Sequence, residues 1–110
     1  MARRSVNNII KFLEQSLKDE GLNISKIVLF GSQSKGKATD ESDIDIAIIS
    51  KDFDNKDIFE RSNMTKKSEI LTLKKFMIPI DIITLTPDEF DNGTSLISEY
   101  SRKGEKVYVQ

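Results

Sequence analysis

The stretch FGSQSKGKATDESDID, residues 30–45, joins two short apolar runs. The first run, residues 27–30, is rich in β-branched side chains and stops at Gly31. The second run, residues 44–49, follows Asp43 and lies within a predicted strand over residues 43–50. Short apolar runs bounded by turn residues predict buried strands, and apolar residues on both faces are typical of a central strand. The fold is therefore predicted to be organised around two strands joined by a polar connection.

Two carboxylates, Asp43 and Asp45, open the second predicted strand one residue apart. Because strand side chains alternate between faces, the two point to the same side of the sheet. Like charges side by side destabilise each other unless a cation lies between them, and carboxylate oxygens are ligands that Mg²⁺ prefers. We expect a divalent cation here. The alternative, in which Asp43 caps the strand and Asp45 pairs with a lysine, stays open.

The turn after the first strand carries Gly31 and Ser32. Glycine lets the backbone approach a ligand closely, and a short helix is expected over residues 32–38. A helix that begins directly after a strand presents backbone N–H groups suited to phosphate. One short segment thus offers phosphate donors at one end and an acid pair at the other, and a nucleoside triphosphate with Mg²⁺ needs both.

The spacing of Gly31-Ser32, ten residues, then Asp43-Ile44-Asp45 resembles the signature of the nucleotidyltransferase superfamily that includes DNA polymerase β. The local pattern Gly-Ser-x-x-Lys-Gly-x-Ala-x-x-x-Ser-Asp-Ile-Asp is much more specific than two acids alone. It is most similar to the minimal nucleotidyltransferases, which are often paired with HEPN-domain proteins in prokaryotic toxin–antitoxin modules. The resemblance continues through residues 80–83 and 103–108. Lys35 departs from it, since many members carry Arg there.

This resemblance implies a nucleotidyltransferase that uses two Mg²⁺ ions, with Mn²⁺ as an alternative. Asp43, Asp45 and Asp81 would be the catalytic and metal-binding carboxylates. The nucleotide, ATP or another nucleoside triphosphate, would contact four further residues: Gly31, Ser32, Lys35 and Ser42. The acceptor implied is a hydroxyl of a HEPN-type protein, with the chain acting as an antitoxin.

A P-loop is the competing interpretation of the same stretch. Gly31-x-x-x-x-Gly36-Lys37 matches that motif up to its last position. Ala38 stands where the motif needs a Ser or Thr hydroxyl to reach Mg²⁺. The chain is also too short for the several strand–helix units that follow a P-loop. The P-loop interpretation is therefore disfavoured.

The composition narrows the chemistry further. The chain has 110 residues, 17 Lys and Arg, 18 Asp and Glu, and a net charge of -1. Nucleic acid is an unlikely partner, because duplex-binding domains are usually basic. With neither Cys nor His, acid–base work falls to carboxylates, Lys, Tyr, Ser or Thr. No apolar segment has signal-peptide or transmembrane length, so we expect a cytoplasmic protein without a membrane partner and one domain over residues 1–110.

Two amphipathic helices are predicted, one before the first strand in the sequence and one after the second strand. The first is capped by Ser5, carries apolar residues at helical spacing and ends at Gly21, with Leu22 as hydrophobic closure. Asp57 or a neighbour caps the second, which runs to about Phe76 as one helix or two. Its four lysines form a basic stripe that is either a solvated face or a contact to a triphosphate or an acidic partner: Lys66, Lys67, Lys74 and Lys75.

A third strand is predicted over residues 78–85, with Pro79 restricted to its start or an edge. Asp81 is its only charge, and a buried acid between isoleucines is costly without a partner. It is either a satisfied structural acid or the third ligand beside Asp43 and Asp45. Thr86 then caps a short helix with Pro87 at its first position, a last helix opens near Thr94, and residues 107–109 form an edge strand.

The fold class is α/β, a small mixed sheet of three to four strands packed with helices. Two functions of different classes remain: nucleotidyl transfer, or an antitoxin that neutralises a helical partner by contact alone. Homo-oligomerisation also stays open. A docking surface for the partner is expected around four aromatic residues: Phe53, Phe59, Phe90 and Tyr100.

Overall fold

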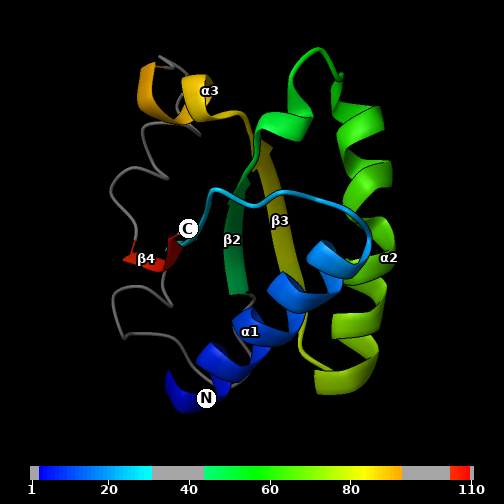
Figure 1. Ribbon diagram of the computed structural model, residues 1–110. Coiled ribbons are helices and arrows are strands. Elements are labelled where there is room, and N and C mark those ends of the chain that lie inside the picture. Colours follow the sequence, from blue (N-terminus) through cyan, green and yellow to red (C-terminus); the bar gives the residue numbers. More distant parts are fainter. Residues whose placement is uncertain (1–2, 31–43, 93–104, 110) are drawn as a thin grey trace.

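The computed structural model describes residues 3–30, 44–92 and 105–109. Its elements follow the chain in the order α1 (Arg3–Asp19), β1 (Lys26–Phe30), β2 (Ile44–Ile49), a 3₁₀ turn (Lys51–Phe53), α2 (Ile58–Phe76), β3 (Ile80–Leu85), α3 (Pro87–Asn92) and β4 (Glu105–Val109) (Figure 1). The helices predicted over residues 32–38 and after Thr94 lie outside the described residues.

The sheet has four strands in the order β3-β2-β1-β4. β1 runs antiparallel to both β2 and β4, whereas β2 and β3 are parallel and α2 is the crossover between them. This confirms the predicted mixed sheet of three to four strands and places β4 at an edge. β3 begins at Ile80, just after Pro79, whose carbonyl accepts from the Ile44 N–H at 3.1 Å.

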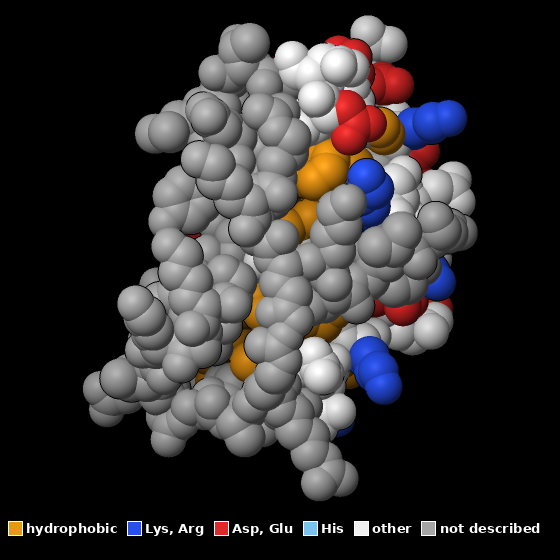
Figure 2. Space-filling model, turned by 90° about the vertical axis from the view of Figure 1, so that its left-hand side faces the viewer, with side chains coloured by type: hydrophobic (Ala, Val, Ile, Leu, Met, Phe, Trp, Pro, Cys, Tyr) orange, Lys and Arg blue, Asp and Glu red, His pale blue; other side chains and the backbone are white. Residues whose placement is uncertain are grey.

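Each face of the sheet has its own apolar cluster. Ile44, Ile46 and Ile48 of β2 pack against α1 in the larger cluster. Ala47 and Ile49 project to the opposite face, where they meet Phe90 of α3 in the smaller one. Hydrophobic side chains on the side of the molecule that carries β4 and α3 are visible in Figure 2. β2 is therefore covered on both faces, as predicted for a central strand.

Helix α1 ends as its sequence predicts. Gly21 has φ +91°, its N–H donates to Lys18 O at 2.9 Å, and the Leu22 N–H donates to Leu17 O at 3.0 Å. These two bonds form a Schellman motif closed by buried Leu17 and Leu22. The predicted cap at the other end is wrong, because the helix already begins at Arg3 and so includes Ser5.

Helix α2 is continuous, which settles the choice between one helix and two. Asp57 and Glu60 form a reciprocal capping box, with Glu60 N–H donating to Asp57 Oδ1 at 2.8 Å and Asp57 N–H to Glu60 Oε1 at 3.1 Å. At the other end Met77 adopts the left-handed conformation, φ 56° and ψ 34°. The cap predicted at Asp57 is thus confirmed.

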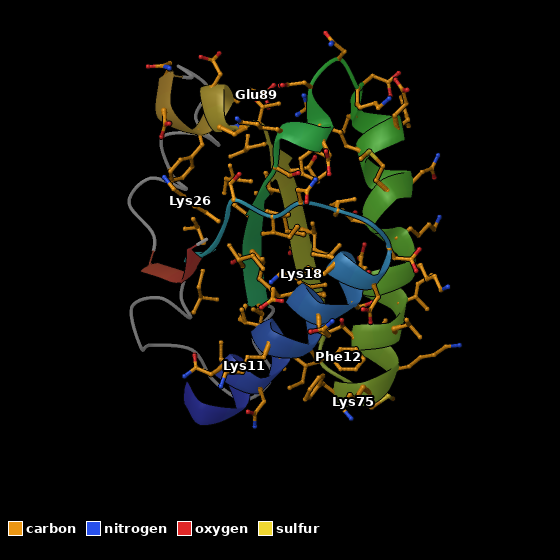
Figure 3. All side chains as sticks on the ribbon, in the orientation of Figure 1. Lys11, Phe12, Lys18, Lys26, Lys75 and Glu89 are labelled. Carbon is orange, nitrogen blue, oxygen red and sulfur yellow. The ribbon has the colours of Figure 1, made fainter. Side chains whose placement is uncertain are left out.

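Helices α1 and α2 pack side by side through a mixture of hydroxyl and aromatic contacts. Ser16 Oγ donates to Ser68 Oγ at 2.9 Å. Phe12 and Phe76 meet edge to face with ring centroids 5.7 Å apart, and Lys75 Nζ lies 5.4 Å from the Phe12 ring centroid (Figure 3). Among the described residues no helix has the length and apolar character that a bilayer span requires.

The aromatic surface predicted for docking is wrong at two of its four residues. Phe53 and Phe90 are buried in the two apolar clusters, one on each face of the sheet. Phe59 is 77% exposed, as expected, and Tyr100 lies outside the described residues. Apolar exposure is instead concentrated along α2.

Candidate active site

Two of the predicted site residues, Asp45 and Asp81, are brought together by the parallel pairing of β2 with β3. They are Cα partners in its register. Neighbouring strands are about 4.8 Å apart, and paired residues project to the same face. That face is the one opposite α1, because Asp45 alternates with Ala47 and Asp81 with Ile83. The carboxylates therefore stand side by side near the start of each strand.

The Asp81 side chain is exposed and makes no hydrogen bond or ion pair with another residue in the described part of the chain. Asp81 is therefore not the buried acid that the structural alternative requires. Asp45 is half-buried. Aspartate is disfavoured in strands, so an exposed acid placed beside a second acid is not explained by the packing of the sheet. This arrangement is suited to a ligand.

The remaining predicted site residues lie outside the described residues: Gly31, Ser32, Lys35, Ser42 and Asp43. The described part of β1 ends at Phe30, the Cα partner of Asp45 and the residue before Gly31. Within the ranges that the structure describes, no group of three or more acidic, His or Cys side chains could hold a metal ion. Two adjacent carboxylates do offer the oxygen ligands that a hard divalent cation needs, and a three-ligand site depends on Asp43.

A pocket of about 570 Å³ lies between α2, β3 and α3, towards the other end of β3. Its centre is an ion pair that the sequence analysis missed, in which Arg61 Nη1 and Nη2 donate to the Glu89 carboxylate at 2.7 and 3.2 Å. Arg61 also donates to Thr84 O at 3.3 Å and to Lys56 O at 2.9 Å. The hydrogen bonds from Arg61 lower the pKa of Glu89 below its ordinary value.

Part of this arrangement was visible in the sequence. Glu89 is the third residue after Thr86, and the two form a capping box at the start of α3, with Glu89 N–H donating to Thr86 Oγ1 at 3.0 Å. Nothing in the local pattern links Arg61 to Glu89, because the pair forms only when α2 and α3 meet at β3. We assign this pocket a structural role, since its charges neutralise each other.

A mixed sheet with two carboxylates side by side at the start of parallel strands is the arrangement expected of a nucleotidyltransferase. A family model described as "Nucleotidyltransferase domain" matches residues 6–107. The chain therefore belongs to the nucleotidyltransferase domain family, and the resemblance drawn from residues 31–45 is confirmed.

Two similar proteins come from Methanocaldococcus jannaschii, both named "Putative protein adenylyltransferase". One is 31% identical over 84 residues, which cover 72% of this chain and 74% of the relative. The other is 28% identical over 88 residues, which cover 79% of this chain. The chain spans 59% of the length of that second relative.

Solved structures share the fold. A toxin–antitoxin structure with AMP-PNP aligns with a TM-score of 0.63 at 23% identity, covering 94% of this chain and 73% of that one. A mutant of the toxin–antitoxin MntA–HpeT aligns with a TM-score of 0.60, also at 23% identity and with the same coverage of both chains. A "putative nucleotidyltransferase from Sulfolobus solfataricus" aligns with a TM-score of 0.54 at 23% identity, covering 83% of this chain and 81% of that one.

Proposed function

We propose that the chain transfers AMP from ATP to a hydroxyl group of a partner protein, as the antitoxin of a toxin–antitoxin pair. The observation that carries the proposal is the in-register placement of Asp45 and Asp81 near the start of two parallel strands, on the sheet face opposite α1. Membership of the nucleotidyltransferase family supplies the reaction class.

The site residues would divide into two groups. Gly31 and Ser32 would bind the β- and γ-phosphates, with Lys35 and Ser42 as further contacts to the nucleotide. Asp43, Asp45 and Asp81 would hold Mg²⁺, or Mn²⁺ in its place. When bound, two such ions neutralise the triphosphate and lower the pKa of the acceptor hydroxyl.

The transfer is a single in-line displacement. The acceptor oxygen attacks the α-phosphorus, the bond between that phosphorus and the bridging oxygen breaks, and pyrophosphate leaves with the electron pair. The exposed Asp81 carboxylate accepts the proton of the hydroxyl. Positioning and charge neutralisation supply most of the rate enhancement, as in other phosphoryl transfers.

A protein is the acceptor best supported by the chemistry of the chain. The net charge of -1 gives no strong electrostatic track for a nucleic-acid strand. The relatives named as protein adenylyltransferases and the structural neighbours from toxin–antitoxin pairs favour the same class of acceptor. We infer a HEPN-type helical protein modified on a hydroxyl, with tyrosine as the expected residue.

Mass spectrometry of the partner after co-expression tests this function. We expect adducts of AMP mass on the partner, lost when the chain carries Asp43→Asn or Asp45→Asn and retained with Asp54→Asn, an exposed acid away from the site. An unmodified partner, alongside transfer to a small molecule or an RNA end, contradicts the proposal. Neutralisation of the partner by Asp45→Asn without modification would instead identify a binding module that acts by contact alone.

A further inference from the structure

Helix α2 is packed with its polar side inwards. Its fully buried residues are Thr65, Ser68 and Thr72. Their hydroxyls are satisfied, with Thr72 Oγ1 donating to Ser68 O at 2.7 Å and Thr65 Oγ1 to Ser62 O at 3.2 Å. An amphipathic surface helix normally buries its apolar stripe and exposes its polar one. Met64 and Phe76 pack half-buried against the larger apolar cluster, while several other large apolar residues of α2 stay exposed.

Across residues 6–29 and 44–92, the side chains whose exposure the structure describes, every exposed large hydrophobic one belongs to α2 or its C-cap. Four of these side chains follow one side of the helix: Phe59, Ile70, Leu73 and Met77. Lys66 completes a repeat of seven with Phe59 and Leu73, and Ile70 and Met77 are also seven apart. We call these five residues the outer stripe. A spacing of three, four and seven along about 27 Å is the pattern that a second helix recognises.

Met77 is a second, independent indication that the outer stripe contacts a partner. It is 78% exposed, and its backbone is left-handed, a conformation that costs a residue with a β-carbon about 1–2 kcal/mol and favours glycine. A helix end under selection for stability alone would place Gly or Asn there. Exposed methionine is a soft, adaptable contact for a partner.

Three lysines, Lys66, Lys67 and Lys74, lie in or beside the outer stripe, and one half-buried acid, Glu69, borders it. Lys66 and Lys74 are exposed and have no ion-pair partner among the described residues, while Lys67 pairs with Glu20 at 3.4 Å. A shallow hollow of about 370 Å³ is lined by Lys66, Lys67, Ile70, Leu71 and Asn63. Ile70 and Leu71 give it apolar lining and Lys66 adds a positive charge that is unpaired among the described residues, which fits an apolar side chain followed by a carboxylate.

We propose that the outer stripe of α2 is a docking surface for an acidic amphipathic helix of a separate protein. Its identification with the acceptor protein rests on the proposed function. A second copy of this chain fits less well, because Lys66 and Lys67 lie near the middle of the stripe. An antiparallel pairing of two α2 helices would bring these cations together at the twofold axis.

The outer stripe ends close to the candidate active site. Met77 and Asp81 are four residues apart, so their Cα atoms are at most about 15 Å apart. A helix bound along α2 would thus hold neighbouring parts of the same partner within reach of the carboxylates on β2 and β3. Docking on α2 and transfer at Asp81 are compatible with one bound partner.

A synthetic peptide tests the surface without knowledge of the natural partner. The probe is a three-heptad helix with Leu at positions a and d and Glu at e and g, which self-repels and stays available for binding. We expect this peptide to bind the full chain at least tenfold more tightly than a matched peptide with Lys at e and g. Equal binding of the two peptides, or binding of neither, overturns the proposal.

Three double variants locate the binding. The first double variant is Ile70→Glu with Leu73→Glu, and the second is Lys66→Glu with Lys74→Glu. Each should weaken binding of the acidic peptide at least tenfold. Lys51→Glu with Lys56→Glu, exposed positions outside α2, makes the same charge change as the lysine pair and should leave binding unchanged. Unchanged binding in the first two variants, with circular dichroism showing that they fold, overturns the proposal. So does sedimentation showing a dimer that Ile70→Glu with Leu73→Glu dissociates, since the stripe is then occupied by a second copy.

The proposed docking surface and the proposed function can be contradicted by different results. Asp45→Asn should bind the acidic peptide like the wild type, because that carboxylate lies on the sheet face opposite α1 and outside the outer stripe. If AMP transfer to the partner occurs but the stripe variants bind peptide and partner normally, the surface is wrong and the function stands. If the stripe binds as expected and no transfer occurs, the function is wrong and the surface stands.

Discussion

Asp81 is an acid in a strand with no structural partner in the described part of the chain, beside a second acid in register. Asp81→Asn removes the repulsion between them and the base proposed for the acceptor hydroxyl. We expect AMP transfer to fall about 10²- to 10⁴-fold. The free energy of unfolding should stay equal or rise, as measured by urea denaturation.

The control for this substitution is Asp54→Asn, which changes an exposed acid away from the site. Both its transfer rate and its stability should match the wild type. If Asp81→Asn unfolds the chain, the carboxylate is structural and its assignment to the active site is wrong.

Glu89 is the second carboxylate whose role depends on its neighbours. Its pKa is lowered, chiefly by the hydrogen bonds from Arg61, so the folded state holds the charged form more strongly than the unfolded state does. The stability that this ion pair contributes is present above the ordinary pKa of 4.5 and is lost as the pH falls through the lowered value of the folded state.

Glu89→Gln should therefore flatten the acid limb of the stability profile. At neutral pH the variant is expected to be less stable than the wild type, and the difference should shrink below about pH 4.5. Chemical denaturation at a series of pH values measures this difference in the free energy of unfolding. A constant difference down to acid pH would show that Arg61 does not depend on the charge of Glu89.

At the scale of elements, α2 depends on its N-terminal cap because its fully buried residues are small hydroxyl side chains. Asp57→Ala removes the acceptor for the Glu60 N–H. We expect a loss of about 0.5–2 kcal/mol in the free energy of unfolding. Asp54→Ala, at a neighbouring exposed acid that does not cap α2, should stay within about 0.5 kcal/mol of the wild type. Equal effects of the two variants would contradict a role for the cap.

The sequence predicted where helices begin and end better than which face of a helix is buried. Asp57 and Gly21 were correctly assigned to helix ends because caps depend on local hydrogen bonds that few residue types make. The buried side of α2 was not predictable, since Thr65, Ser68 and Thr72 face inwards where apolar residues are expected. That choice is made by the close approach to α1, which local periodicity does not contain.

The same limit explains the aromatic residues and the candidate site. Phe53 and Phe90 lie in polar segments, which predicts exposure, but each is drawn into an apolar cluster that forms only in the folded sheet. Asp45 and Asp81, 36 positions apart, were placed together through family resemblance. Their register is a property of strand pairing, and neither strand alone specifies it.

At the scale of the whole molecule, a bound nucleotide should stabilise the fold. ATP with Mg²⁺ or Mn²⁺ binds only the native state, so saturation at a hundred times the dissociation constant adds about 2.7 kcal/mol. For a chain of this size we expect the melting temperature to rise by about 10 °C. Scanning fluorimetry measures the shift.

The metal and the carboxylates should both be needed for this shift. ATP with a chelator is expected to shift the melting temperature less, and Asp45→Asn should reduce the response to ATP with Mg²⁺. Calorimetry that detects no binding at millimolar ATP and Mg²⁺ would count against an active nucleotide site.

The contact of Arg61 with Thr84 has a further consequence for solubility. Leu85 O accepts at 3.0 Å from the N–H of Ser50, the residue after β2. Carbonyls alternate along a strand, so Thr84 O points away from β2. β3 is an edge strand in the described sheet, and its outer carbonyls are a template for pairing with another chain. Arg61 occupies one of them and places a guanidinium on the rim. Arg61→Ala should therefore promote aggregation through β3, with thioflavin-positive aggregates appearing sooner than in the wild type at equal fractions folded.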